Sequence, residues 1–159
     1  MSSDEFTAFY VRAKDGCLRA AVASGMRPGE AEEAVAEAFA RAWASWGKVR
    51  TTSSPAAWVV RTAINANISS WRKRRREVSV DGVREAVVDG WDSSTDVVAA
   101  VRQLPPRQRE VVVLRYLLDL DTATTAEVLG IARGTVAAHL HHALANLRAR
   151  LTHYEGAYS

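Results

Sequence analysis

Apolar residues recur three and four positions apart along most of this chain, and that spacing restricts it to a helical fold. Nearly every periodic segment follows this pattern rather than the strict alternation of a half-buried strand. The clearest case places the apolar face of one helix at Ala31, Ala34, Val35, Ala38, Phe39, Ala42, Trp43 and Trp46. We therefore predict an all-α protein.

Cap and turn residues divide the first half of the chain into three predicted helices. Serine and proline favour helix starts, and glycine favours helix ends. The predicted boundaries are a start near Ser3 and a stop at Gly25, a start at Pro28 and a stop at Gly47, and a start at Ser54-Pro55. Three helices of this length can enclose one small core.

The sign of the charge reverses in the middle of the chain, although the net charge is only +3. A basic run, Arg72–Arg76, is followed by a segment to Asp96 that carries several aspartates and little positive charge. Such a reversal indicates different partners for neighbouring segments and marks a domain boundary. We predict two small helical domains, 1–76 and 96–155, joined by a flexible acidic linker, 77–95.

The C-terminal half has the pattern of a helix-turn-helix. A short helix from Thr122 to Leu129 is followed by a turn at Gly130 and a longer helix from Arg133. In this motif the early turns of the second helix enter the major groove of DNA. The predicted outward residues are Arg133, Thr135, Ala138, His139, His141 and His142. A three-helix core without a nucleic-acid partner would show the same pattern.

Composition narrows the function classes further. The single cysteine, Cys17, cannot form an internal disulfide and suits a reducing compartment. An apolar run long enough for a signal peptide or a membrane span is missing from the sequence, so we expect a cytoplasmic protein without membrane contact. A phosphate loop and a nucleophile–base pair are also missing, so we expect no enzymatic activity and no cofactor. His139 and His142 lie one turn apart, yet further metal ligands are lacking nearby, and we predict no metal site.

Several segments together resemble sigma-70-family transcription factors. The segments 104–116, 126–130, 134–136 and 143–148 resemble their region 4. The segment 30–43 resembles region 2.2 of extracytoplasmic-function sigma factors, and 55–67 resembles regions 2.3 and 2.4. The resemblance covers about residues 5–152 in the order region 2, linker, region 4, and is greatest to the actinobacterial sigma-E-like group.

The resemblance implies a function in promoter-specific transcription initiation. By analogy with the family, RNA polymerase core would bind through its β′ coiled coil to Glu33, Glu37, Phe39 and Arg41. The opened −10 promoter element would contact Arg50, Ser54, Trp58, Arg61, Asn65, Asn67, Trp71, Arg72, Lys73 and Arg74. The helix-turn-helix would read the −35 element and touch the β flap. Promoter DNA and RNA polymerase core are the expected partners, and an anti-sigma factor is a third candidate.

Some residues depart from the family pattern. Ala132 stands where a serine usually caps the reading helix, Ala137 and Ala138 replace a Lys-Ser pair, and His142 replaces an arginine. We therefore expect modest −35 affinity. Two other functions stay open at this point: a stand-alone helix-turn-helix regulator, which would bind duplex DNA by itself, and a sigma-like decoy that binds a regulator without initiating transcription.

Overall fold

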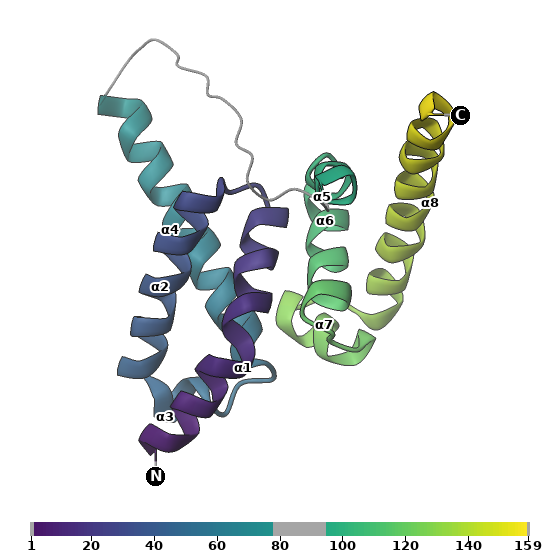
Figure 1. Ribbon diagram of the computed structural model, residues 1–159. Coiled ribbons are helices and arrows are strands. Elements are labelled where there is room, and N and C mark those ends of the chain that lie inside the picture. Colours follow the sequence, from purple (N-terminus) through teal and green to yellow (C-terminus); the bar gives the residue numbers. More distant parts are fainter. Residues whose placement is uncertain (1, 78–94, 159) are drawn as a thin grey trace.

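The computed structural model describes the backbone of residues 2–77 and 95–158 and the side chains of residues 3–67 and 97–151. Every regular element in these ranges is a helix, which confirms the predicted class (Figure 1). The N-terminal module consists of α1 (Ser2–Ala23), α2 (Pro28–Ala44), α3 (Trp46–Val49) and α4 (Pro55–Glu77). The C-terminal module consists of α5 (Thr95–Arg102), α6 (Pro106–Val112), the π-helical turn η1 (Val113–Leu117), α7 (Thr122–Leu129) and α8 (Arg133–Tyr158).

Most predicted helix ends agree with the structure, but the end of α2 does not. Gly25 adopts a positive φ of 120° just after α1, where only glycine is free of strain. The predicted stop at Gly47 is wrong, because α2 already ends at Ala44 and Gly47 lies inside α3. Ser45 leaves the helical conformation (φ −120°, ψ 31°) between the two helices. The ring of the following residue, Trp46, then packs 5.2 Å from the ring of Phe9.

The core of the N-terminal module is built from small side chains, which let α1, α2 and α4 approach one another closely. Cys17 of α1, Ala38 of α2 and Ala63 of α4 are each 0–1% exposed. The Cys17 thiol lies 3.7 Å from the Ala56 carbonyl oxygen, to which it donates. Burial raises the pKa of this thiol to about 12, so it stays protonated and is a structural residue.

The helix-turn-helix forms where the sequence predicts it. The carboxylate of Asp121 caps α7 by accepting from the Thr124 backbone N–H at 2.7 Å. Gly130 adopts the left-handed conformation (φ 70°) that ends α7. Val136 anchors α8 in the core with no exposed surface. Full burial of one such side chain stabilises the fold by about 1.5–3 kcal/mol.

The two modules share their cores, which the sequence did not predict. Val101, Val112 and Ala143 of the C-terminal module belong to the same buried cluster as the helices of the N-terminal module. Ala57 of α4 lies in turn within the core of the helix-turn-helix, beside Leu114. Figure 1 shows α1 between α4 and the C-terminal helices. The predicted acidic linker falls almost entirely on 78–94, outside the described residues.

Candidate nucleic-acid interface

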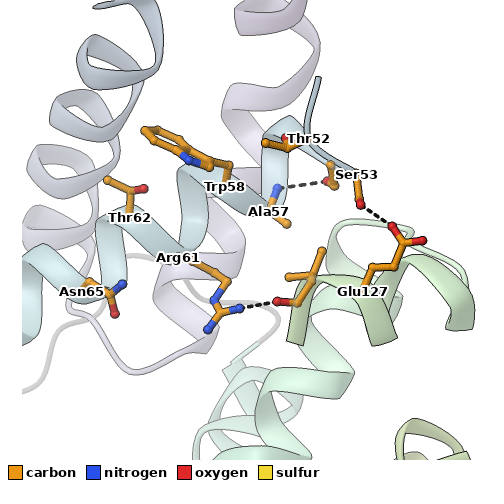
Figure 2. Close-up of a pocket in the computed structure, with 10 residues that line it drawn as sticks. Thr52, Ser53, Ala57, Trp58, Arg61, Thr62, Asn65 and Glu127 are labelled. Atoms are coloured by element: carbon orange, nitrogen blue, oxygen red, sulfur yellow. Dashed lines mark hydrogen bonds between the residues drawn. The ribbon is translucent and has the colours of Figure 1, made fainter. Parts of the chain in front are cut away.

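One face of α4 gathers three different kinds of nucleic-acid-binding side chain. Trp58, Arg61 and Asn65 lie three and four residues apart, so they share one side of the helix. With the loop before α4 they line a cleft of about 350 Å³. Figure 2 shows these side chains along the helix. An indole face, a guanidinium and an amide can respectively stack on a base, neutralise a phosphate and hydrogen-bond a base edge.

The loop before α4 adds hydroxyl groups to the cleft. Ser53 is exposed and Thr52 is half-buried, and both line it. Ser54, a predicted DNA contact, is only 8% exposed, and its Oγ accepts from the Ala57 backbone N–H at 3.1 Å. The structure thus makes Ser54 the N-cap of α4 rather than a presented contact, whereas the prediction omitted Ser53 and Thr52. Their place in a polar loop directly before a capped helix was the available signal.

The C-terminal module closes one side of this cleft. Glu127 and Val128 of α7 line it together with the residues of α4. The Ser53 hydroxyl donates to the Glu127 carboxylate. Arg61 Nη1 donates to the Val128 carbonyl oxygen at 2.5 Å (Figure 2). The sequence could not indicate Glu127 or Val128, because they lie more than sixty residues from their partners.

Arg50, another predicted −10 contact, forms an ion pair on the surface of the N-terminal module. Its Nε lies 2.9 Å from Glu5 Oε1, and both side chains are about half exposed. The hydrogen bond from Arg50 lowers the pKa of the Glu5 carboxyl, and the same bond raises the pKa of Arg50. Exposed pairs of this kind are weak, so Arg50 can exchange this carboxylate for another anion.

The remaining predicted −10 contacts lie further along α4. Asn67 is half-buried on the helix. Trp71, Arg72, Lys73 and Arg74 lie within the bounds of α4, which extends to Glu77 as the sequence predicts. Their side chains lie outside the described part of the structure.

The predicted polymerase-binding residues occupy two different environments on α2. Glu33, Glu37 and Arg41 are exposed, and Arg41 Nη2 lies 2.8 Å from Glu37 Oε2. Phe39 is only 4% exposed, with its ring 5.6 Å from that of Phe9. Its predicted contact with a partner is corrected accordingly, because the ring faces inward and supports α2 from the core.

Trp43 shows the opposite error. The sequence placed it on the apolar face of the second helix, yet 48% of its surface is exposed. Its ring lies 5.1 Å from that of Phe6 at the edge of the aromatic cluster. Exposed tryptophans are enriched at protein interfaces. Trp43 lies two residues after Arg41, so it extends the exposed face of α2.

The predicted −35-reading residues are presented at the start of α8. Arg133, Thr135 and Ala138 are exposed, as are His141 and His142, whereas His139 is half-buried. The rings of His141 and His142 lie 5.5 Å apart. Within the described side chains, no three potential metal ligands gather around one point.

Ala132 occupies the position before α8. Its carbonyl oxygen accepts from the backbone N–H groups of Thr135 (3.0 Å) and Val136 (3.1 Å). An alanine side chain supplies no acceptor for the free N–H groups of the first turn. The start of α8 therefore lacks the side-chain cap that Asp121 provides for α7.

Comparisons with known proteins agree with this geometry. Residues 12–77 match Sigma-70 region 2, and residues 94–147 match Sigma-70, region 4. The RNA polymerase sigma-E factor of Streptomyces coelicolor is 34% identical over 148 residues, which cover 89% of this chain and 84% of the relative. The ECF RNA polymerase sigma factor SigL of Mycobacterium tuberculosis is 32% identical over 132 residues, covering 77% and 75%.

A solved structure shares the fold across both modules. The sigma factor RpoE of Bartonella quintana, in complex with the anti-sigma factor NepR, aligns with a TM-score of 0.72 at 23% identity, covering 93% of this chain and 97% of that one. Among the described helices, none has the length and apolar character needed to span a membrane. The chain therefore belongs to the sigma-70 family of RNA polymerase sigma factors, in its extracytoplasmic-function group, whose members direct RNA polymerase to promoters.

Proposed function

We propose that the cleft on α4 captures the unpaired non-template strand of the −10 element. The observation that carries this proposal is the convergence of Trp58, Arg61 and Asn65 on one cleft. Unpaired bases lose their stacking partners, so a protein that binds them must supply flat side chains and hydrogen-bonding groups. Preferential binding of the unpaired strand favours open over closed promoter DNA, and no covalent step is required.

The residues around the cleft divide into contacts and supports. We assign the phosphates to Arg50, Arg61 and the basic run Arg72–Arg74. We assign the base edges to Asn65 and Asn67, with Ser53 as a neighbouring donor. Ser54 and Phe39 act as supports, because both are buried and already satisfied within the module.

The exposed start of α8 would read the −35 element in the major groove. Arg133 supplies the positive charge and Thr135 supplies a hydroxyl, whereas Ala138 offers only a methyl group. His141 and His142 would lie at the far edge of the reading face. The low permanent charge of this face supports modest −35 affinity, because phosphate neutralisation dominates the affinity of most DNA-binding proteins.

The exposed face of α2 would bind the β′ coiled coil of RNA polymerase core through Glu33, Glu37 and Arg41, with Trp43 as an apolar anchor. The C-terminal module would contact the β flap. An anti-sigma factor is a further expected partner, as in the RpoE–NepR complex. We place region 2 at 1–76, the linker at 77–95 and region 4 at 96–155, and we expect a non-catalytic cytoplasmic protein.

Run-off transcription with purified core polymerase tests this function directly. Fragmented genomic DNA from the source organism is transcribed with and without the protein, and with Arg61→Ala as a site variant. We expect discrete new transcripts whose aligned start sites reveal the two promoter elements. A stable complex with core that gives no transcripts would identify a decoy or a need for an activator, and absence of any complex would leave a stand-alone regulator.

A further inference from the structure

The cleft on α4 already has an occupant, which is the end of α7. Val128 lies in the last turn of α7, and its carbonyl oxygen accepts from Arg61. The carbonyl end of a helix carries partial negative charge, so a guanidinium there acts as a C-terminal cap. Arg61 thus uses one charge for an acceptor of its own chain that resembles a phosphate oxygen.

Glu127 provides a second anionic group in the same cleft. Its carboxylate accepts from the Ser53 hydroxyl (Figure 2). Carboxylate and phosphate oxygens compete for the same donors. A strand that enters this cleft must displace Glu127 and Val128, because both line it together with Trp58 and Asn65.

Apolar packing supports these polar contacts. Ala57 lies one residue before Trp58 on α4 and is 1% exposed within the helix-turn-helix core. Leu118, just after η1, packs against the buried clusters of both modules. The contact between α7 and α4 therefore has a desolvated centre with the cleft at its edge.

A second connection lies on α5, away from the cleft. Arg102 Nη2 donates to the Gly25 carbonyl oxygen at 3.0 Å. Gly25 belongs to the turn after α1 and lines no part of the cleft. Arg102 can therefore influence the cleft only through the placement of the two modules.

We propose that α7 occupies the −10 strand-binding cleft, and that Glu127 and the Val128 carbonyl compete with DNA for Ser53 and Arg61. The inference rests on the proposed function of the cleft. In this arrangement Glu33 and Glu37 on α2 and Arg133 on α8 remain exposed. The polymerase-binding and −35-reading faces are thus accessible while the −10 cleft is covered, and separation of the modules uncovers it.

Two single substitutions in the full chain test the competition. Glu127→Ala removes the anion, and Arg102→Ala weakens the connection between the modules without touching the cleft. We expect each to tighten binding of a labelled single-stranded DNA pool of random sequence by about twofold to fivefold, the range for exposed charged contacts. Glu110→Ala is the matched control, because its partner Arg107 lies on the same helix (3.1 Å), and it should leave the affinity unchanged.

Arg61→Ala separates failure of the competition from failure of the cleft itself. If Arg61→Ala weakens binding while Glu127→Ala and Arg102→Ala change nothing, the cleft binds DNA but α7 does not compete for it. If none of the three variants changes the affinity, the cleft is not the DNA site and both proposals fail. Circular dichroism melting of each variant checks that it folds.

A reversible lock gives the complementary test. Ser53→Cys and Glu127→Cys place two thiols where side chains now touch, and a short bis-methanethiosulfonate reagent bridges them. Cys17 is buried, and its pKa of about 12 keeps it unreactive. We expect the bridged protein to lose single-stranded DNA binding and a thiol reductant to restore it, whereas the labelled Ser53→Cys single variant stays competent. Undiminished binding by the bridged protein would overturn the proposal.

Discussion

The two proposed DNA-binding surfaces differ in what they hold before DNA arrives. The cleft on α4 is rich in hydrogen-bonding groups, and its arginine already donates to the Val128 carbonyl. The start of α8 is exposed and poor in permanent charge, with Arg133 as its one arginine among the proposed contacts. DNA must replace internal partners at α4, whereas at α8 it meets side chains in water.

The difference separates two sources of affinity. Internal partners hold Arg61 and Arg50 in place, so these residues lose less side-chain entropy on binding DNA, but each must exchange an existing contact. The face of α8 requires no exchange, but it offers few charges and an uncapped first turn. We therefore expect initiation to depend more strongly on α4 than on α8.

The largest expected effect compares substitutions on the two surfaces. Arg61→Ala combined with Asn65→Ala should reduce run-off transcription by about a hundredfold, because two hydrogen bonds, one of them charged, are lost. Arg133→Ala should reduce it by only about tenfold. Transcript yield per unit of core complex is the measurement, with the exposed Arg148→Ala as control. Equal losses from both surfaces would contradict the comparison.

Salt dependence sharpens the same contrast. Removing one phosphate contact should lower the slope of log affinity against log salt by about 0.7 on single-stranded DNA and about 0.9 on duplex DNA. We expect the first change for Arg61→Ala with a −10 single strand and the second for Arg133→Ala with a −35 duplex. Titrations across a salt series measure both slopes. A slope unchanged by Arg133→Ala would remove this residue from the phosphate contacts.

Restoring the missing cap of α8 should bring the two surfaces closer together. Ala132→Ser supplies an acceptor for the first-turn N–H groups and should stabilise the protein by about 1 kcal/mol. For a chain of this size, that corresponds to a rise in Tm of about 2–4 °C. Ala137→Ser makes the same chemical change inside the helix and should give no rise. Thermal melting followed by circular dichroism tests the pair, and equal shifts would rule out a capping effect.

The smallest expected effect concerns the existing cap of α7. The hydrogen bond from the Thr124 backbone N–H lowers the pKa of the Asp121 carboxyl below its usual value of 3.8. A lowered folded-state pKa contributes stability above the unfolded pKa, and that contribution is lost as the pH falls through the folded pKa. Wild-type protein should therefore exceed Asp121→Asn in urea midpoint at about pH 7, and the difference should vanish below about pH 3. A difference that persists in acid would show that charge is not its cause.

Local rules predicted the helices and most of their ends. Apolar spacing located the helices, and Asp121, Gly25 and Gly130 act as local signals that depend on few neighbours. The end of α2 was missed, because Ser45 breaks the helix so that Trp46 can join the aromatic cluster. That break depends on residues of α1, which no local pattern contains.

The candidate sites were predicted less completely than the helices. Resemblance placed Trp58, Arg61 and Asn65 on the right helix, and the structure brings them to one cleft. The sequence could not separate contacts from supports, and burial assigned Phe39 and Ser54 to support. Periodicity placed Trp43 in the core, although it lies at the edge of the apolar face, where helix packing leaves half of it exposed.

The sequence by itself determined the helical class, the order of the two modules and the family, because periodicity, caps and motif spacing are properties of neighbouring residues. Only the tertiary structure decided that the modules share a core and that α7 lies on the α4 cleft. Those contacts join residues more than sixty positions apart, such as Arg61 and Val128. Their existence depends on shape and burial across the whole molecule, which no local pattern encodes.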